Sequence, residues 1–507
     1  MATPNRVLDP EVQVAAPGPI VDRKSGQGSG LAADLVELFL DAARRGGERP
    51  FLWAKREGVY QPWSWQRCHD EVLAIATAFR AHGLVPGERV LLCAENRPEW
   101  ALADLATMLA GGITVPAYTT NTTDDHLYLL QHSEASAVVV SNRRIAERLF
   151  PAIRAVGGLK LVLCLDAATP ADDLGVPAVH WDEALALGQR HRFQPEPIDP
   201  DDIACLIYTS GTGGRPKGVM LTHRNILANV KAAHQVLTQV GLGDDVFLSF
   251  LPLSHAYEHT AGQFFPMAVD AQIFYAEGVE TLQTNLVETR PTIMACVPRL
   301  YEVRRQRILS GVDRAGGLKA RLFHKAVELG SRAYEDPTSL SLAERLMNRS
   351  LDRLVRSKVK ERFGGRMKAL VSGGAPLNYD IGLFFTALGL PLLQGYGQTE
   401  NGPVASVNLP GKVKLHTVGP PLPGMEVKIA PDGEILLRGD AIMKGYWKDE
   451  AASAEALRDG WLHTGDVGVI DEDGYIQITD RKRDLIVNSG GDNIAPQRVE
   501  GILALEP

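Results

Sequence analysis

The chain has 507 residues, a length that exceeds one ordinary hydrophobic core and predicts two or more domains. Apolar residues make up 45% of the composition, as in globular proteins generally. The net charge of −8 and the pI near 5.9 provide no basic excess for neutralising a phosphate backbone, so we expect no nucleic acid as a partner.

No apolar run approaches the roughly 18 residues that a membrane-spanning helix needs, which leaves only peripheral membrane contact open. None of the five cysteines forms a CxxC pair, and Cys93, Cys164 and Cys205 lie inside apolar runs. We therefore expect buried, reduced thiols and a cytoplasmic protein. The sequence gives no indication of the oligomeric state.

Residues 1–30 are rich in Pro, Gly and charge, and we expect a flexible segment there. Beyond it, "RVLLCAEN", "ITVPAYT" and "ASAVVVSN" are typical of strands and are separated by helical patterns. The first of these helices is expected to have Asn96 as its N-cap and to stop at Gly111. This alternation predicts a first α/β subdomain with a parallel sheet over residues 31–199.

The same alternation returns over residues 200–410 and predicts a second α/β subdomain. Between its candidate strands, an arginine-rich stretch from about Arg304 to Arg366 predicts long exposed helices. The candidate strands are "IACLIYT", "DVFLSFLP", "AQIFYAE", "TIMACVP", "MKALVSGG" and "PLLQGYG".

The pattern changes after Gly411. The Asp-Gly dipeptides in "PDGEI" and "EDGYI" lie between alternating apolar runs, which is typical of antiparallel hairpins. Residues 411–480 are therefore expected to form a small β-barrel-like subdomain. Residues 481–507 are expected to form a hinge and only the beginning of a C-terminal α+β domain.

Residues 208–223, "YTSGTGGRPKGVMLTH", form a glycine-rich and hydroxyl-rich loop. Successive backbone N–H groups in such a loop can cradle an anion, and Lys217 adds a point charge. Unlike the Walker loop, this one is followed by an extended run rather than a helix, so it joins two strands. We expect a phosphate site, with a plain glycine-rich hairpin as the alternative.

Two further clusters suit the base and the metal of a nucleotide. In "QGYGQTEN", residues 394–401, Tyr396 lies between two glycines, which predicts an exposed face for stacking on a base. Glu400 supplies the kind of carboxylate that Mg²⁺ binds together with phosphate oxygens. "VSGGAPL", residues 371–377, would form a flat wall opposite Tyr396. Ordinary strand-to-helix turns are the alternative for both clusters.

Two clusters near the end of the β subdomain suit a ribose. Asp466, in "GWLHTGDVG", offers a carboxylate that can accept hydrogen bonds from both ribose hydroxyls. Arg481, in "DRKRDLIV", is placed to reach the ribose or a phosphate. An Asx turn and a solvated charged linker are the respective alternatives.

Taken together, "YTSGTGGRPKG", "GYGQTE", "TGD" and "DRKRDLIV" occur in an order and spacing that resemble the adenylate-forming enzymes. This superfamily includes acyl-CoA synthetases, adenylation domains of peptide synthetases and luciferases. "LSFLPLSHAYEHT" and "PAYTTNTTDDHLYLLQHSEAS" make the chain most similar to long-chain fatty-acid–CoA ligases. The resemblance covers about residues 30–507.

The resemblance implies a nucleotide site assembled from these motifs. The residues implied to hold the β- and γ-phosphates are Thr209, Ser210, Gly211, Thr212, Gly213, Gly214 and Lys217. Those implied to flank adenine are Gly374, Ala375 and Pro376 on one side and Gly395, Tyr396 and Gly397 on the other.

It also implies the catalytic and metal roles. Thr399 would contact the α-phosphate, and Glu400, together with Thr212, would hold Mg²⁺. His255 would lie near the substrate carboxylate. The implied catalytic set is Lys217, Thr399, Glu400 and His255, the implied ribose set is Asp466 and Arg481, and the implied hinge is Arg483.

The implied function is ATP-dependent activation of a long-chain fatty acid through an acyl-adenylate, then thioesterification to CoA. ATP, Mg²⁺ and CoA would be the cofactor and co-substrates. Two alternatives stay open: transfer of the acyl group to a carrier protein, and a non-catalytic nucleotide- or acyl-binding module. Activation of an amino acid is less well supported, because Glu258 is the only acid between Val246 and Ala268 that could pair with an ammonium group.

The chain departs from the family pattern at two places. Gly213 replaces the second threonine of the usual TSGTTG loop, so one hydroxyl contact is lost and weaker ATP binding is expected. The family's C-terminal domain also carries a catalytic lysine near its far end. The sequence ends before that position, so we expect the 507 residues to lack this lysine.

Overall fold

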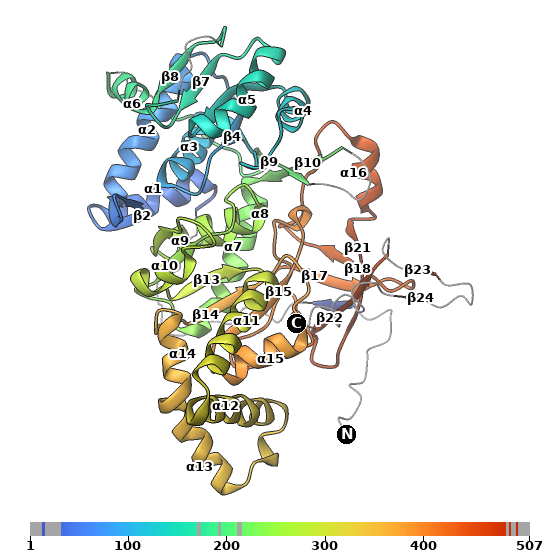
Figure 1. The fold of residues 1–507 in the computed structure, drawn as a ribbon. Helices are drawn as coiled ribbons and strands as arrows, with labels where there is room; N and C mark the ends of the chain where they lie inside the picture. The colour runs from blue at the N-terminus through green and yellow to red at the C-terminus, as the bar shows by residue number, and fades with distance from the viewer. Residues whose placement is uncertain are drawn as a thin grey trace.

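The computed structural model describes residues 13–15, 32–169, 174–190, 194–209, 215–482, 486–487 and 493–494. Two eight-stranded, mostly parallel sheets and one six-stranded antiparallel sheet form the framework of the protein (Figure 1). This confirms the predicted α/β class with an added antiparallel β subdomain. Within the expected N-terminal segment, strand β1 (Gln13–Ala15) pairs with the antiparallel sheet.

The first large sheet has a parallel centre and an antiparallel edge. Its six central and far strands run parallel, whereas β10 and β19 pair antiparallel at one edge. The strand order is β19 (Gly445–Tyr446), β10 (Lys217–Thr222), β9 (Ile203–Thr209), β5 (Ile113–Pro116), β4 (Arg89–Cys93), β6 (Ala135–Val140), β7 (Leu161–Cys164) and β8 (Ala178–His180).

The second large sheet is also parallel at its centre, with an antiparallel strand at each edge. Its order is β16 (Ser406–Val407), β15 (Leu392–Tyr396), β14 (Ala369–Ser372), β13 (Ile293–Cys296), β11 (Val246–Ser249), β12 (Gln272–Tyr275), β2 (Pro50–Arg56) and β3 (Val59–Ser64). All the strands predicted for residues 200–410 are present.

Both large sheets contain strands from both sides of the predicted boundary between residues 199 and 200. Strands β2 and β3, from the first predicted subdomain, complete the second sheet, whereas β9 and β10 belong to the first. Strand β19 leaves the predicted β subdomain at 411–480 to pair with β10. The local apolar pattern correctly marked the strands, but it contains no information on which distant strand supplies the hydrogen bonds.

Successive residues of the central strands enter different cores. In β4, Val90 lies in a core shared with the second sheet, and Leu91 lies in a core on the opposite face. In β11, Phe247 lies in the shared core and Leu248 in a third core. Both large sheets are therefore covered on both faces, as expected for parallel sheets.

Helices fill the layers around these sheets. Those of the first half are α1 (Leu35–Gly46), α2 (Trp65–Ala81), α3 (Pro98–Leu109), α4 (Thr123–Ser133), α5 (Arg143–Val156), α6 (Trp181–Arg190) and α7 (His223–Leu237). Short helical segments follow: η1 (Thr238–Val240), α8 (Ala256–Glu258), η2 (His259–Phe264) and α9 (Phe265–Ala268).

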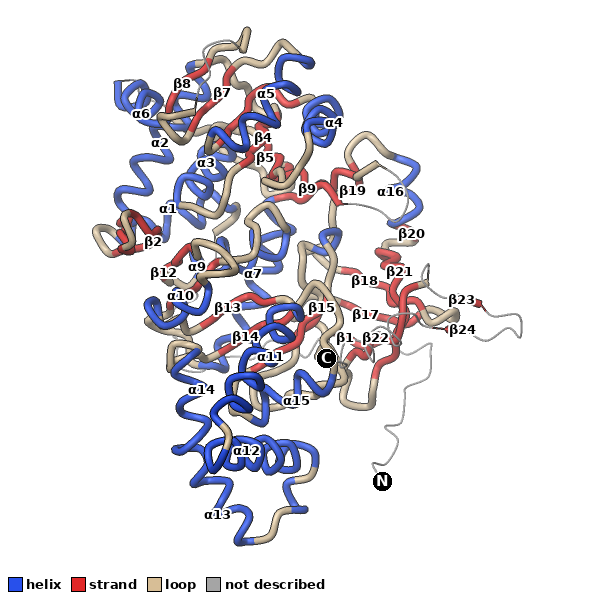
Figure 2. Tube along the Cα trace, in the orientation of Figure 1, coloured by secondary structure: helices blue, strands red, loops and turns tan. Residues whose placement is uncertain are grey.

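The remaining helices cover the second sheet or extend from it. They are α10 (Leu282–Thr289), α11 (Pro298–Ala315), α12 (Gly317–Glu335), η3 (Pro337–Ser339), α13 (Leu342–Leu351), η4 (Asp352–Arg356), α14 (Ser357–Arg362), α15 (Tyr379–Ala387), η5 (Thr399–Asn401) and α16 (Glu450–Ala456). Helices α12 and α13 lie at the end of the molecule opposite the first sheet (Figure 2). Among the described helices, none has the length and hydropathy needed to cross a membrane.

The antiparallel sheet contains the strands that the Asp-Gly turns predicted. It comprises β1, β17 (Glu426–Ile429), β18 (Glu434–Arg438), β21 (Trp461–Ile470) and β20 (Leu457–Arg458), with β22 (Ile476–Arg481) on β21. A separate pair is formed by β23 (Ile486–Val487) and β24 (Asn493–Ile494). All five cysteines are free and buried, as predicted.

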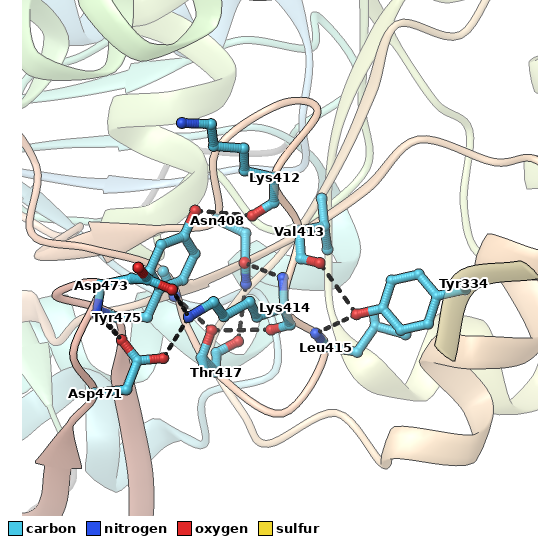
Figure 3. A network of polar contacts seen from close by, with 11 residues as sticks. Tyr334, Asn408, Lys412, Val413, Lys414, Leu415, Thr417, Asp471, Asp473 and Tyr475 are labelled. Carbon is cyan, nitrogen blue, oxygen red and sulfur yellow. Dashed lines mark hydrogen bonds and ion pairs between the residues drawn. The ribbon is translucent and has the colours of Figure 1, made fainter. Parts of the chain in front are cut away.

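A polar network attaches this sheet to helix α12 (Figure 3). The Lys414 Nζ lies 2.6 Å from a carboxylate oxygen of Asp471 and 2.6 Å from one of Asp473, in the turn between β21 and β22. On the other side, the Tyr334 hydroxyl of α12 donates to the carbonyl of Val413 and accepts from the N–H of Leu415. Residues 413–415, between the second and third sheets, are therefore held from both sides.

Asn96 is not the N-cap of α3. The N-cap is Arg97, without a side-chain hydrogen bond, whereas Asn96 reaches the second sheet. Its Nδ2 donates to the Leu251 carbonyl at 2.6 Å and to Ser249 Oγ at 3.1 Å, and its Oδ1 accepts from the Leu253 N–H at 3.0 Å. The amide thus satisfies backbone groups that β11 leaves unpaired at its end, which explains why it does not cap its own helix.

We expect Asn96→Ala to lower the free energy of unfolding by about 2 kcal/mol, because it leaves the N–H of Leu253 and the carbonyl of Leu251 without this partner. Denaturant unfolding measures the change. Ser64→Ala, which removes one local cap hydrogen bond from α2, is the control and should cost about 1 kcal/mol. Equal losses in both variants would contradict the bridging role of Asn96.

Candidate functional site

A cavity of about 560 Å³ is lined by residues of all three sheets. Eleven of the residues singled out from the sequence line it: Thr209, Lys217, His255, Gly374, Gly395, Tyr396, Gly397, Thr399, Glu400, Asp466 and Arg481. Ala375 and Pro376 do not belong to the lining. Residues 210–214 and Arg483 lie outside the described residues.

The glycines at the end of β15 allow close backbone packing. A Cβ on Gly397 would lie 2.0 Å from the carbonyl oxygen of Pro403, and one on Gly395 would lie 3.1 Å from that of Ser406. The returning chain is held by a hydrogen bond from the Ala405 N–H to the Tyr396 carbonyl at 2.8 Å. Any larger residue at 397 would force this segment and the cavity wall apart.

Tyr396 does not present the exposed face that its position between glycines predicted. The residue is only 8% exposed, and its hydroxyl donates to Asp466 Oδ2 at 2.6 Å. The close return of the chain at Ala405 encloses the ring, which explains the difference. Tyr396 still lines the cavity, but its main described contact is with the carboxylate opposite.

Asp466 accepts hydrogen bonds from three side chains that also line the cavity. Besides Tyr396, the Gln398 Nε2 donates to its Oδ2 at 2.7 Å, and the Arg481 Nε donates to its Oδ1 at 3.0 Å. Because Asp466 is only 3% exposed, these donors fix the orientation of a buried charge. Gln398 was missed from the sequence; its position inside "GYGQTEN" was the available signal.

Lys217 and Glu400 lie on two sides of Tyr446. The Tyr446 hydroxyl donates to Glu400 Oε1 at 2.9 Å, and the Lys217 Nζ lies 4.8 Å from the centre of the same ring. Tyr446 belongs to β19 and reaches this place because β19 pairs with β10. No local pattern could have identified it, since its contacts depend on a strand pairing over more than two hundred residues.

Helix α4 supports the two ends of the glycine-rich loop. The Tyr128 hydroxyl donates to the Pro216 carbonyl at 2.7 Å, and His132 Nδ1 lies 2.8 Å from the hydroxyl of Tyr208. Trp447 Nε1 donates to the carbonyl of His132 at 3.1 Å. As predicted, the loop joins two strands, β9 and β10, and not a strand and a helix.

The cavity fits a magnesium ion carried by a phosphate rather than a metal cage built by the protein. Within the described ranges, no three His, Cys, Asp or Glu side chains gather as metal ligands. Glu400 instead offers a single carboxylate with one oxygen bonded to Tyr446. Mg²⁺ prefers such a site, with one or two carboxylates completed by phosphate oxygens and water.

His255 lines the cavity as the N-cap of α8. Its Nδ1 accepts a hydrogen bond from the Tyr257 N–H at 3.1 Å, so the ring proton of the neutral form is on Nε2. The surrounding protein displaces water and lowers the pKa of His255, which favours the neutral ring. A neutral Nε2–H can donate one hydrogen bond to an acid without adding charge.

Glu258, three residues after His255, is buried and does not line the cavity. Burial raises its pKa to about 8, although a hydrogen bond with Ser249 opposes the shift. A Cβ on Gly262, in the π-helical turn η2, would lie against the Glu258 carboxyl and displace it. Glu258 is therefore a protonated core residue near neutral pH.

Comparison with known proteins agrees with this geometry. Residues 39–447 match the family described as AMP-binding enzyme. The chain belongs to this family. A mycobacterial member, "Long-chain-fatty-acid--CoA ligase FadD15" of Mycobacterium tuberculosis, is 33% identical over 458 residues, which cover 89% of this chain and 74% of the relative. "Long chain acyl-CoA synthetase 7, peroxisomal" of Arabidopsis thaliana is 33% identical over 92% of this chain and 69% of its own.

Solved structures of the family show the same fold. Apo MatB from Rhodopseudomonas palustris superposes with a TM-score of 0.70 at 23% identity, covering 94% of this chain and 83% of that chain. The anthranilate CoA ligase AuaEII, in complex with anthranoyl-AMP, gives a TM-score of 0.72 at 20% identity over 94% and 83% of the two chains. The AMP-binding fold is thus shown by structure as well as by sequence.

The raised pKa of Glu258 predicts a pH dependence of stability. Between its ordinary value of 4.5 and about 8, the folded protein keeps this proton and the unfolded chain releases it. Stability from this group is therefore complete below 4.5 and is lost as the pH rises to about 8. We expect Glu258→Gln to remove this loss, so that thermal unfolding midpoints of the variant decline less steeply over this interval. Parallel pH profiles would contradict a raised pKa.

Proposed function

We propose that this protein is an ATP-dependent long-chain fatty-acid–CoA ligase that works through an acyl-adenylate. The observation that carries the proposal is the convergence of Lys217, Glu400, Asp466 and His255 on one cavity. These residues come from segments far apart in the chain, and each supplies a group that the reaction needs. The relatives with long-chain ligase names, 33% identical over most of the chain, support the choice of substrate.

ATP would lie along the cavity with its phosphates toward β10. Lys217 and Thr209, with the loop 210–214, would bind the β- and γ-phosphates, and Thr399 the α-phosphate. The ribose would face Asp466 and Arg481. Because Asp466 Oδ2 already accepts two hydrogen bonds, Oδ1 is the oxygen we expect to receive a ribose hydroxyl.

Adenine would occupy the space between the two glycine segments. Gly374 forms one wall and Gly395 to Gly397 the other, and both line the cavity. The backbone of Gly374, with φ at +80°, is in the left-handed region that favours glycine. Tyr396 would contact the base with an edge of its ring and would not stack on it with an exposed face, because its hydroxyl is held by Asp466.

Mg²⁺ would be held by Glu400 and would neutralise charge on the phosphates and the pyrophosphate that leaves. Thr212, in the loop, is the second proposed ligand. The Tyr446 hydroxyl orients the Glu400 carboxylate, and the aromatic ring keeps the Lys217 ammonium in place beside it. The protein therefore positions both charges before ATP binds.

In the first step, an oxygen of the fatty carboxylate attacks the α-phosphorus of ATP. A bond forms between this carboxylate oxygen and the α-phosphorus. The bond from the α-phosphorus to the oxygen that bridges it to the β-phosphate breaks, and pyrophosphate leaves. The His255 Nε2–H would hold the other carboxylate oxygen and orient the attacking one. In the second step, the CoA thiol, having lost its proton, attacks the acyl carbon and AMP leaves, with rotation about Arg483 as the proposed switch.

Activation of an amino acid is disfavoured by the position of Glu258. An ammonium group would need an acid in the acyl part of the cavity, but Glu258 is buried away from the lining. Burial also keeps it protonated near neutral pH. Transfer to a carrier protein instead of CoA is the remaining alternative for the second step, and dependence of thioester formation on CoA distinguishes the two acceptors.

We expect palmitate- and Mg²⁺-dependent pyrophosphate release from ATP, and we expect Tyr446→Phe to lower kcat about tenfold. The loss follows because Glu400 is no longer oriented by a hydrogen bond, which costs about 1 kcal/mol or more. A raised requirement for Mg²⁺ should accompany the lower rate. A coupled pyrophosphate assay, with Mg²⁺ titrated, measures both effects.

Tyr334→Phe is the matched control, because it removes a tyrosine hydroxyl that lies outside the cavity. It should leave the Mg²⁺ requirement unchanged. No pyrophosphate release with any fatty acid, whatever its chain length, would overturn the proposed ligase function. Unchanged Mg²⁺ dependence in Tyr446→Phe would instead overturn only the role given to Glu400.

A further inference from the structure

Helix α13 and the turn η4 expose a patch of large apolar side chains. Leu342 is 80% exposed, Leu346 66% and Leu354 54%, and Met347 adds a fourth at 39%. Leu342 and Leu346 are one helical turn apart and so lie on the same face. Single exposed leucines are common on protein surfaces. Four large apolar residues within α13 and η4 form a patch, and such a patch is typical of an interaction site.

Basic side chains are interleaved with these leucines. Arg349 and Arg353 follow Leu346 at helical spacings, and both are exposed. Neither makes an ion pair within the described part of the chain. From Ser341 to Arg362 the sequence has seven Lys or Arg and three Asp or Glu, although the whole chain carries a net charge of −8.

Two of the three acids of this segment are already engaged with other arginines. Glu344 lies 2.7 Å from Arg332 and Asp352 lies 2.7 Å from Arg356, so neither carboxylate neutralises the exposed arginines. The patch therefore combines apolar surface with positive charge that has no counter-charge of its own. Such a surface is complementary to a layer of anionic groups that covers an apolar interior.

The helix that carries the patch is formed and anchored on its other side. Ser341 and Glu344 form a capping box at its N-terminus, and Leu351 is 1% exposed. Arg356 donates from its guanidinium to the carbonyls of Ala387 and Ala326, on α15 and α12. The patch is thus presented on a rigid support at one end of the molecule (Figure 1), where no other described element covers the exposed leucines.

We propose that α13 and η4 dock on the surface of a lipid bilayer that contains anionic lipids. Leu342, Leu346 and Leu354 would enter the boundary between headgroups and acyl chains, and Arg349 and Arg353 would contact lipid phosphates. This proposal rests on the proposed function for its purpose, because a long-chain fatty acid partitions into bilayers and docking would bring the cavity close to its substrate.

A second copy of the chain is a less suitable occupant of the patch. A two-fold contact places the same surface of each copy against the other, so this net positive patch would face an equally positive patch. Bringing like charges together without acids between them is unfavourable. The charge of the patch thus favours lipid phosphate over self-association.

Co-sedimentation of the full chain with vesicles tests the proposal. We expect binding to vesicles of phosphatidylcholine mixed with phosphatidylglycerol, weaker binding to phosphatidylcholine alone, and release at high salt. Leu342→Glu/Leu346→Glu and, separately, Arg349→Glu/Arg353→Glu should each weaken binding to the mixed vesicles about tenfold or more. Val59→Glu/Val279→Glu is the matched control, since these valines are 65% and 67% exposed elsewhere, and it should bind as the unchanged chain does.

Failure to bind mixed vesicles, or equal binding by the α13 variants and the control, would overturn the docking proposal. So would concentration-dependent self-association that Leu342→Glu/Leu346→Glu abolishes, because the patch would then contact a second copy. Vesicle binding is measured without ATP or acid, and pyrophosphate release is measured separately with a micellar fatty acid. A chain that binds vesicles but releases no pyrophosphate would contradict the ligase function alone.

Discussion

The carboxylate of Asp466 joins the second sheet to the antiparallel sheet at the cavity. Its oxygens accept hydrogen bonds from Tyr396, which ends β15, from Gln398 just beyond it, and from Arg481, which ends β22. A buried charge of this kind is stable only when its donors are in place, because removing it from water is costly. The position of Asp466 therefore constrains both walls of the nucleotide cavity, and the backbone between Tyr396 and Ala405 must approach closely enough to require Gly397.

Tyr446 likewise connects two charged residues of the cavity. One aromatic side chain contacts Lys217 through its face and Glu400 through its hydroxyl, so a cation and an anion share one support. In the function proposed above, this support places Lys217 for the terminal phosphates and Glu400 for a metal ion.

Much of this could be predicted from the sequence because the information is local. Strands such as Arg89–Cys93 and Ala369–Ser372 have uninterrupted apolar runs, and the Asp-Gly turns specify hairpins without help from the rest of the fold. The motifs around Lys217, Glu400 and Asp466 are likewise short runs of consecutive residues, so they can be identified without knowledge of the fold. What could not be predicted depends on distant pairing: the exchange of β2 and β9 between sheets, the bridging role of Asn96, and the enclosure of Tyr396.

The pairing of β19 with β10 also has a consequence for the order in which the protein forms during synthesis. Residues 217–222 can build their hairpin with β9 early, but the outer edge of β10 stays open until residues 445–446 have been made. In the same way, β2 remains without its inner neighbour until β12 follows more than two hundred residues later. The nascent chain thus carries two unfinished sheets with exposed edges, which are templates for wrong pairing. Neither large sheet can therefore act as an independent folding unit, and the surroundings of Lys217 and Glu400 are complete only after residues 445–446 have been made.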